Sequence, residues 1–407
     1  MNYILFDDKS RNNLLPLTFT RPVADIRIGI LTIREKWEKY LDVKISSLTQ
    51  HYLGFKFPCV VEHDNLLING SVLPGKELIR EIKKLQTGQK LVQDNTLIAL
   101  KLSGEQLNDI TKKSKNAEKL IIDSLLEERG FIKIPTSLKC VKIENLWDIF
   151  NKNGEAIHHD FELLTKGRKS QTISNSNTVF GADKIFVEEG AKIEGAILNA
   201  ITGPIYIDKD AEIMEGSIVR GPFALCEAAV LKLGTKIYGP TTIGPYSKAG
   251  GEINNSVIFG YSNKAHDGFL GNSVIGEWCN LGADTNNSNL KNNYSEIQVW
   301  NYNADEFINT GLQFCGLIMG DHSKCGINTM FNTGTVVGVN ANIFGSGFPK
   351  KFIPCFSWGG SEGFVTFSLE KAFEVAQKVW ERRNKAFDSV EKNIFTQIFE
   401  LTSKYRS

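Results

Sequence analysis

The sequence lacks the features that mark several large classes of protein. Its seven cysteines include no C-x-x-C pair, and their odd number cannot close a complete disulfide framework. No window approaches the roughly 18 apolar residues that a membrane span requires, and no basic leader precedes an apolar run. The 47 Lys and Arg residues nearly balance the 46 Asp and Glu residues, without the basic excess typical of nucleic-acid binders. We therefore expect a cytoplasmic protein with no nucleic-acid or membrane partner.

Glycine is absent before Gly29. Loops that cradle phosphate groups with main-chain amides are usually rich in glycine, so the start of the chain does not contain such a loop. Two acidic residues, Asp7 and Asp8, follow an apolar run at Tyr3 to Phe6 that we predict as a buried strand. Adjacent carboxylates are candidate ligands of Mg²⁺, and two solvated acids that open a loop are the alternative.

Residues 1–165 alternate between short apolar runs and amphipathic stretches. The elements predicted from this pattern are a strand at 3–6, a helix at 30–41, a strand at 43–46, a helix at 76–86 and a helix at 117–130 that Gly130 closes. Strands that alternate with helices are typical of an α/β layer. We therefore expect an α/β domain over residues 1–165.

Residues 170–366 have a different periodicity. Apolar residues recur six positions apart in two series, namely Ile207, Ile213, Val219, Leu225, Leu231, Ile237 and Ile243, and then Met319, Cys325, Phe331, Val337 and Ile343. Neither a helix nor a simple strand has this period. It is the hexapeptide repeat of a parallel β-helix, in which three short strands complete a triangular coil of roughly 18 residues. Small residues four positions after most of the apolar ones fit tight corners, with Phe223 as the exception.

Residues 367–407 form a third region with the pattern of a long helix. Ser368 fits an N-cap, Glu370 lies in the first turn, and an apolar stripe runs from Leu369 to Trp380. We expect a lid on the last coil of the β-helix, and a partner-binding helix is the alternative.

The strict repeat breaks after Ile243, and His266 lies in the interruption. A histidine can take a proton near neutral pH, as acylation of an amine requires, and nearby asparagines offer uncharged hydrogen-bonding groups for sugar hydroxyls or a pantetheine arm. The alternative is that His266 is a corner histidine hydrogen-bonded to the main chain. The asparagines would then be turn residues, namely Asn280, Asn286, Asn287 and Asn289. A metal site is disfavoured because no cysteine or second histidine stands at ligand spacing.

The stretch that begins at His266 reads H-x-x-F-L-G-x-S-x-I-G-x-x-x-N-x-G-A. It resembles the acyltransferase motif of bifunctional sugar-1-phosphate nucleotidyltransferase/acetyltransferases, which make UDP-N-acetylglucosamine. The resemblance covers residues 251–345 and implies a left-handed parallel β-helix that trimerises and binds acetyl-CoA between subunits. It also implies that His266 is the general base.

The same resemblance implies further site residues. Asn280 and Asn289 match asparagines that contact sugar or acetyl-CoA, and Glu252 matches a glutamate of the sugar site. Asn254 stands where the family often has a phosphate-binding lysine, for which Lys264 would compensate. Phe269 replaces the family's tyrosine, so one hydroxyl contact is missing.

The cofactor side of the resemblance lies further along the chain. The segment 326–338 and the pair at 350–351 occupy the part of the β-helix where the family grips coenzyme A. The residues expected there are Gly282, Ala283, Ile327, Gly345 and Lys351. Small corners would hold the pantetheine arm, and Lys351 would meet a phosphate of coenzyme A, with a solvated lysine as the alternative.

The N-terminal region resembles the same family more weakly. Residues 14–29, LLPLTFTRPVADIRIG, look like the PLT-x-TRPKP-x-x-P-x-x-G segment of nucleotidyltransferases, but Val23 replaces its phosphate-neutralising lysine. Arg21 and Arg27 would then supply the positive charge. The resemblance therefore indicates a divergent subgroup with a shortened N-terminal domain.

Three functional hypotheses follow. The first is an enzyme that couples nucleotidyl transfer, with Mg²⁺ and UTP or another NTP, to acetyl-CoA-dependent N-acetylation of an amino-sugar phosphate, for nucleotide-sugar synthesis toward the cell envelope. The second is a non-catalytic sugar-nucleotide-binding or assembly module with a degenerate N-terminal domain. The third is an acyltransferase for another amino sugar. The family resemblance implies a homotrimer in each case.

Overall fold

The computed structural model describes residues 1–114 and 130–406 of the chain, which divides into two compact units. The first unit contains residues 1–14, 20–26 and 31–145, and the second contains residues 15–19, 27–30 and 146–407. Two short segments of the N-terminal region therefore belong to the second unit. Neither unit is a single uninterrupted stretch of chain.

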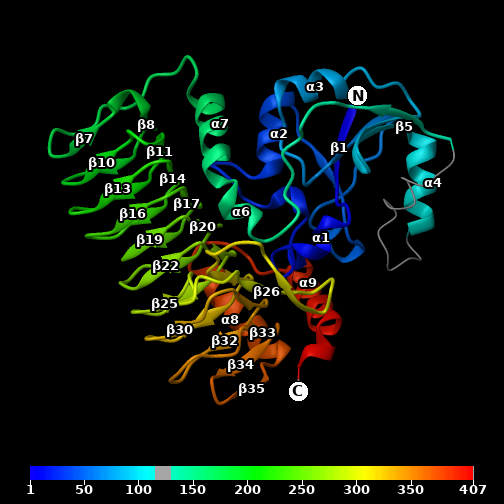
Figure 1. Ribbon diagram of the computed structural model, residues 1–407. Helices are drawn as coiled ribbons and strands as arrows, with labels where there is room; N and C mark the ends of the chain where they lie inside the picture. The colour runs from blue at the N-terminus through cyan, green and yellow to red at the C-terminus, as the bar shows by residue number, and fades with distance from the viewer. Residues whose placement is uncertain (115–129, 407) are drawn as a thin grey trace. The chain divides into compact units, whose positions relative to one another are not determined.

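The described part of the first unit is built on a six-stranded mixed sheet (Figure 1). Its strands, in spatial order, are β2 (Ser46–Leu48), β1 (Asn2–Phe6), β3 (Asp64–Asn69), β5 (Thr96–Ser103), β4 (Gln89–Gln93) and β6 (Ile132–Pro135). β1 pairs in parallel with both β2 and β3, whereas β5 is antiparallel to its two neighbours. The apolar run of β1 is buried in this sheet, as its sequence predicts.

The described helices of this unit are α1 (Ser10–Asn13), α2 (Ile33–Leu41), α3 (Lys76–Ile82) and α4 (Gly104–Ser114). Three of them begin at a side-chain cap or a glycine, and α1 follows Lys9 without a side-chain cap. α2 begins three residues later than predicted because Thr32 and Glu35 form a reciprocal capping box. The predicted strand at 43–46 is displaced to β2, and the helix predicted at 117–130 lies almost wholly outside the described residues. The alternation of strands and helices confirms the α/β layer.

The second unit is dominated by a left-handed parallel β-helix, called the solenoid below (Figure 1). Each coil passes through three sheets. The first sheet contains β7 (Thr178–Phe180), β10 (Ile197–Asn199), β13 (Ile218–Arg220), β16 (Lys236–Tyr238), β19 (Glu252–Asn254) and β22 (Phe269–Gly271). The second contains β8 (Ile185–Val187), β11 (Ile205–Ile207), β14 (Phe223–Leu225), β17 (Thr241–Ile243), β20 (Val257–Ile258), β23 (Val274–Ile275), β28 (Leu317–Met319), β31 (Thr335–Val337) and β33 (Phe352–Ile353).

The third sheet is the longest. It contains β9 (Lys192–Ile193), β12 (Glu212–Ile213), β15 (Val230–Leu231), β18 (Lys248–Ala249), β21 (Asn263–Lys264), β24 (Asn280–Leu281), β29 (Lys324–Cys325), β32 (Asn342–Ile343), β34 (Ser357–Gly360) and β35 (Gly363–Thr366). β25 (Asn286–Asn287) pairs with β30 (Met330–Phe331), and β26 (Gln298–Asn301) and β27 (Glu306–Asn309) form a hairpin whose first strand contacts β31.

Both six-residue series predicted from the sequence form the solenoid core. Every member of the two series is at most 5% exposed, and all belong to one buried cluster. The strands of successive coils pair in parallel register, so each inward side chain stacks on its equivalent in the next coil. Phe223, the exception to the small-residue pattern, is itself buried in this core.

The outer faces of the solenoid sheets differ in their burial. Outward residues of the second sheet such as Thr242 and Val257 are fully buried, and helix α7 (Asn153–Thr165), preceded by α6 (Asp148–Asn151), contacts β14 and β17. The first sheet is open instead, with Ile218 46% and Tyr238 37% exposed. A ligand therefore has access to the solenoid from the first sheet.

The C-terminal region forms two helices rather than the single one predicted. α8 (Leu369–Glu381) begins at the predicted N-cap, Ser368, whose hydroxyl accepts from the main-chain N–H of Lys371. Asn384 adopts a left-handed conformation, and Asp388 caps a new helix, α9 (Ser389–Leu401). The two helices pack on a stack of aromatic side chains at one corner of the solenoid, which the Trp278–Trp380 contact illustrates, with ring centroids 4.9 Å apart. The helices contact Trp278, His322 and Phe356 of successive coils, so they cover a corner along the solenoid and not the last coil alone.

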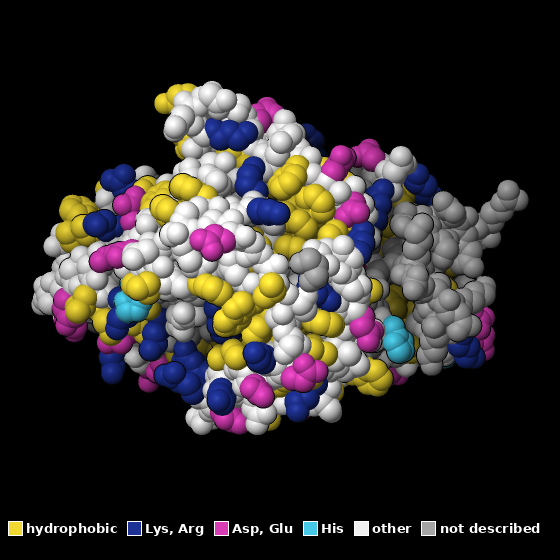
Figure 2. Space-filling view, turned by 90° about the horizontal axis from the view of Figure 1, so that it is seen from below, with side chains coloured by type: hydrophobic (Ala, Val, Ile, Leu, Met, Phe, Trp, Pro, Cys, Tyr) yellow, Lys and Arg dark blue, Asp and Glu magenta, His cyan; other side chains and the backbone are white. Residues whose placement is uncertain are grey.

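The charge of the molecule is distributed as its composition suggests. Acidic and basic side chains are interspersed over the face drawn in Figure 2, together with several apolar patches. Within the described ranges, no helix has the length and apolar character needed to traverse a lipid bilayer.

Candidate functional site

The candidate site lies at the corner where each coil turns from the third sheet to the first. One residue per coil occupies the same place there, two positions after the last inward residue of the third sheet. We call this set the corner column, and it comprises Gly195, Glu215, Leu233, Gly251, His266, Ala283, Ile327 and Gly345. Main-chain hydrogen bonds join neighbouring corners, as from Asp284 N to Asp267 O at 3.1 Å and from Asn328 N to Ala283 O at 2.8 Å.

His266 is exposed at a corner that is longer than the one preceding it. Only Gly250 and Gly251 separate the third sheet from the first in the preceding coil, whereas residues 265–268 do so in the coil of His266. The short corner lies tightly under the long one, because a Cβ at Gly251 would lie 2.8 Å from Asp267 Cα. The glycine pair therefore lets the His266 corner rest on the coil below, and His266 reaches solvent.

Polar residues continue from this corner over the outer face of the first sheet. Glu252 and Phe269 are paired in register on β19 and β22. The Glu252 carboxylate accepts a hydrogen bond from the Tyr238 hydroxyl, and burial together with this bond raises the pKa of Tyr238 to about 12. The side-chain oxygen of Asn286 accepts from the main-chain N–H of Phe269 at 2.8 Å. The face beside His266 thus combines a carboxylate, an aromatic ring and an amide.

The two asparagines predicted for substrate binding lie apart, Asn280 in β24 of the third sheet and Asn289 two residues after the end of β25. Asn289 is half-buried and donates to Asn272 Oδ1 at 2.8 Å, at the far edge of the same face as Asn254. Asn280 is exposed on the third sheet, where it pairs with Asn263 and Lys324. Asn289 therefore borders the face that carries Glu252, and Asn280 faces outward from a separate sheet.

Lys264 points into the solenoid rather than toward solvent. It is 2% exposed and stands at the inward position of β21, in register with Ala249. Its ammonium donates to the main-chain oxygens of His266 at 2.6 Å and Asp267 at 3.1 Å, and burial lowers its pKa to about 8. This placement differs from the phosphate contact that the resemblance implies, because the ammonium is directed to the backbone of the corner.

The residues expected to hold coenzyme A are only partly brought together. Ala283, Ile327 and Gly345 follow His266 in the corner column, and Gly282 adjoins Ala283. Ile327 is 70% exposed, so this line of corners is open to a ligand. Lys351 lies elsewhere, just before β33 of the second sheet, where it donates to Gln298 O of the β26–β27 hairpin at 2.9 Å.

The two acidic residues after β1 are held by protein donors. Asp7 accepts from Val23 N at 2.7 Å and from the Thr49 hydroxyl at 2.5 Å, and burial raises its pKa to about 6. Burial also acts to raise the pKa of Asp8, but an ion pair at 2.8 Å with Lys142 outweighs this effect and lowers it.

A divalent cation does not fit this arrangement. The carboxylates of Asp7 and Asp8 are directed at protein cations, hydroxyls and amides instead of converging on one point. The described residues also contain no cluster of three or more His, Cys, Asp or Glu side chains arranged for a metal. Asp7 and Asp8 are therefore not arranged as Mg²⁺ ligands.

The two arginines expected to meet phosphates belong to different units. Arg21 is 5% exposed in the first unit, beside the 3-10 turn that donates to Asp7. Arg27 belongs to the second unit, where its guanidinium donates to Ile30 O and lies 3.8 Å from Cys226 Sγ. Arg21 is thus the candidate cation of the first unit.

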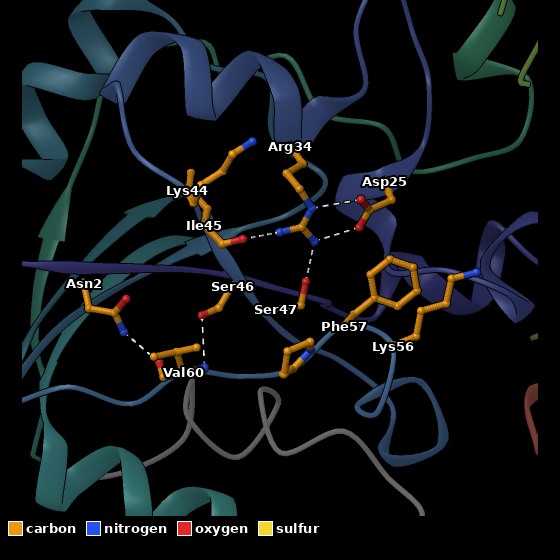
Figure 3. A pocket seen from close by; sticks show the side chains of 11 residues that line it. Asn2, Asp25, Arg34, Lys44, Ile45, Ser46, Ser47, Lys56, Phe57 and Val60 are labelled. Carbon is orange, nitrogen blue, oxygen red and sulfur yellow. Dashed lines mark hydrogen bonds and ion pairs between the residues drawn. The ribbon is translucent and has the colours of Figure 1, made fainter. Parts of the chain in front are cut away.

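A cavity of about 540 Å³ opens at the edge strand β2 of the first unit (Figure 3). Arg34 crosses it with a bidentate bond to Asp25, at 2.8 and 2.7 Å, and a third bond to Ile45 O at 2.6 Å. Lys44, Lys56 and Phe57 complete its rim. The sequence did not indicate this cavity, because Asp25 and Arg34 approach each other only through the fold.

Comparison with known proteins supports the family. Residues 3–169 match the family model described as sugar nucleotidyl transferase. The bifunctional sugar-1-phosphate nucleotidylyltransferase/acetyltransferase of Sulfurisphaera tokodaii is 30% identical over 170 residues, which is 41% of this chain and 40% of that protein. The bifunctional protein GlmU of Methanocaldococcus jannaschii is 25% identical over 311 residues, 70% of this chain and 71% of that protein. GlmU of Methanococcus maripaludis is 26% identical over 313 residues, with the same two shares.

The shared segments fall on both parts of the chain. The family model covers the α/β unit, and the matches over 70% of the chain extend beyond it into the solenoid. The chain nevertheless spans only 40% of the length of the first of these relatives. Residues 3–169 thus match the sugar nucleotidyl transferase family, and the chain is similar to bifunctional sugar-1-phosphate nucleotidylyltransferase/acetyltransferases.

Proposed function

We propose that the solenoid transfers an acetyl group from acetyl-CoA to the amine of an amino-sugar 1-phosphate, with His266 as the general base. The observation that carries this proposal is the corner column, in which the exposed His266 is followed by the open corners of Ala283 and Ile327. A thioester laid along these corners would end beside the imidazole. The polar face around Glu252 would hold the sugar.

The reaction needs one group that takes and returns a proton. The amine nitrogen forms a bond to the thioester carbonyl carbon, and the imidazole of His266 accepts the proton that the nitrogen loses. The C–S bond then breaks, and the departing thiolate of coenzyme A takes the proton from the imidazolium. The products are an acetamido sugar and free coenzyme A, and the histidine returns to its neutral form.

The sugar would be recognised by neutral and acidic groups. Glu252, Asn254 and Asn289 can bond sugar hydroxyls without a large desolvation cost for the two amides. Phe269 supplies an apolar ring at the place where the family has a tyrosine. We therefore assign these residues to the sugar side and the corner column to the acetyl-CoA side.

For the first unit we propose transfer of a nucleotidyl group from UTP or another NTP to the sugar phosphate, giving a UDP-N-acetylglucosamine-type product. The match over residues 3–169 supports this proposal. Arg21 would contact a phosphate as a bidentate donor.

A direct test measures release of free coenzyme A from acetyl-CoA and glucosamine-1-phosphate. Wild type should release it, and His266→Ala should reduce the rate by roughly a hundredfold or more, as loss of a general base does. His158→Ala is the matched control, because His158 is also exposed in the second unit but lies on α7. Equal rates for His266→Ala and wild type would remove His266 from the reaction. Because the chain has free cysteines, coenzyme A should be quantified chromatographically.

A second candidate function is favoured by the geometry at Asp7 and Asp8. With both carboxylates engaged by protein donors, the first unit would bind a sugar nucleotide without turnover. Pyrophosphate release from UTP and N-acetylglucosamine-1-phosphate distinguishes the two. Release that falls in Arg21→Ala supports nucleotidyl transfer, and binding without release supports the non-catalytic alternative.

We also propose that the solenoid assembles as a homotrimer. The open outer face of the first sheet carries Ile197, Ile218 and Tyr238, which are between 37% and 46% exposed. Burial of such a face against a second copy would remove apolar surface from water. Light scattering after size-exclusion chromatography should give three times the chain mass of 45.4 kDa, and a monomer mass would contradict the proposal.

A further inference from the structure

A buried lysine stands where the solenoid otherwise has small or aliphatic side chains. In the third sheet, the inward positions of successive coils are Leu231, Ala249, Lys264, Leu281 and Cys325. Lys264 lies in register on Ala249, whose short side chain leaves room for the lysine stem. Its ammonium then bonds the main-chain oxygens of His266 and Asp267 from inside the coil.

Other corners of the solenoid are held by a different hydrogen bond. In three of the other four-residue corners, the threonine at the fourth position donates its hydroxyl to the carbonyl of the first residue. These pairs are Thr235 to Lys232 O at 2.5 Å, Thr285 to Gly282 O at 2.7 Å and Thr329 to Gly326 O at 2.8 Å. The corner of His266 has Gly268 at the threonine position, so it has no hydroxyl to make this bond.

Packing explains why threonine does not occur there. Gly268 has φ of +112°, and a Cβ on it would lie 2.2 Å from Thr285 O. A side chain at this position would meet the backbone of the next coil. The corner that carries the candidate base therefore lacks the usual tie, and Lys264 supplies two hydrogen bonds to it instead.

We propose that Lys264 is a positioning residue that fixes the backbone of the His266 corner and thereby aims the imidazole at the reacting amine. This inference rests on the proposed acetyl transfer for its catalytic consequence. The anchoring itself rests only on the bonds at 2.6 and 3.1 Å and on the missing threonine. Burial lowers the pKa of Lys264 to about 8, which means that placing its charged ammonium in the core opposes folding. Lys264 therefore stabilises this corner although its charge destabilises the core.

The test replaces the ammonium with an apolar group of similar length. Lys264→Met keeps the stem and removes both donors. Lys324→Met is the matched control, because the Lys324 ammonium also donates to a backbone oxygen from the third sheet, that of His322 at 2.8 Å, at a different corner. Two quantities are measured for the full chain: kcat and KM for acetyl transfer, and hydrogen–deuterium exchange of a peptide covering residues 265–270.

We expect Lys264→Met to lower kcat by roughly ten- to a hundredfold, the loss that a small misplacement of a catalytic group causes, with little change in the KM for acetyl-CoA. Exchange at residues 265–270 should be faster, and Lys324→Met should change neither quantity. Unchanged exchange in Lys264→Met overturns the anchoring, and unchanged kcat overturns its catalytic role. An equal fall of kcat in Lys324→Met overturns the proposal as well, because it would show general loosening of the solenoid.

Failure of the proposed function gives a different result. If wild type does not acetylate any amino-sugar phosphate, exchange at residues 265–270 alone decides whether Lys264 anchors the corner. Should Lys264→Met not fold, Lys264→Leu replaces it under the same criteria. Leucine fits because Leu231 and Leu281 stand at the same inward position.

Discussion

The ammonium of Lys264 lies 2.6 Å from the main-chain oxygen of His266 and reaches it from the interior of the solenoid, whereas His266 itself is exposed. A charged group inside a coil core and a solvent-facing histidine are thus joined through one peptide unit. This arrangement couples the stability of the solenoid to the charge of Lys264.

We expect the stability difference between wild type and Lys264→Met to depend on alkaline pH. The pKa of Lys264 is about 8 in the folded chain and 10.5 as the reference value. Between these values the unfolded chain holds more protons, so the contribution of Lys264 to stability rises with pH, and its full cost is present below pH 8. The urea midpoint of wild type should rise relative to that of Lys264→Met as the pH is raised from 7 to 10.5. A difference between the two urea midpoints that does not change with pH would contradict burial of the charge. For Lys236→Met, which replaces an exposed lysine, the difference from wild type should not depend on pH.

Ile327 and Leu233 occupy equivalent places in the corner column and are 70% and 68% exposed. Only Ile327 lies on the side of His266 assigned to acetyl-CoA. Ile327→Glu should raise the KM for acetyl-CoA roughly tenfold, because its charge would be desolvated and would repel the anionic cofactor. Leu233→Glu should leave the KM unchanged. A rise in both variants would mean that the cofactor does not follow the corners beyond His266.

Asp7 has the opposite pH behaviour to an ordinary paired carboxylate. Its pKa rises from 3.8 to about 6 because burial outweighs the favourable contacts with Arg11, Thr49 and Val23. Between pH 3.8 and 6 the folded chain holds more protons, so the contribution of Asp7 to stability falls as pH rises through this window. Thermal unfolding of wild type and Asp7→Asn from pH 4 to 7 should therefore diverge in favour of the variant. The unfolding temperature of Asp109→Asn, at an exposed site on α4, should keep a constant difference from that of wild type. If wild type becomes more stable than Asp7→Asn as the pH rises, the Asp7 carboxylate is stabilised as an ion.

Ile237 tests the core of the solenoid. It is 1% exposed in the predicted six-residue series, so Ile237→Ala should destabilise the second unit by about 2–5 kcal/mol. Lys236→Ala, at the adjacent outward position, should change stability by less than about 0.5 kcal/mol. The solenoid transition in chemical denaturation, followed separately from that of the first unit, gives both values. Similar losses in both variants would mean that the six-residue period does not define the inward face.

Much of the fold follows from local patterns. The six-residue period identifies the inward residues, because in a coil of three short strands only that spacing returns an apolar side chain to the interior. The N-cap at Ser368 and the buried strand at residues 2–6 are likewise local in origin. The prediction of a single C-terminal helix was wrong because the chain takes a left-handed conformation at Asn384 and Asp388 then caps a second helix.

The site depends more on tertiary structure. The motif around His266 identifies the coil, and its place in the corner column leaves the histidine exposed, as it does Leu233 and Ile327. Lys264 could not be placed from the sequence, because a lysine at a predicted inward position breaks the pattern and is understood only with Ala249 beneath it and two carbonyls within reach. Asn280, which the resemblance assigns to a sugar or acetyl-CoA contact, is turned outward on the third sheet because Leu281 takes the inward position.

The sequence by itself determined that this protein contains an α/β region followed by a parallel β-helix, since periodicity alone selects both. It also determined which histidine stands in the interrupted coil. Only the tertiary structure decided that Arg27 joins the solenoid unit, that Asp7 and Asp8 are engaged by protein donors, and that Lys264 bonds the His266 corner. The side-chain direction of these residues depends on corner length and on the neighbouring coils. Neither factor produces a periodic pattern in the sequence.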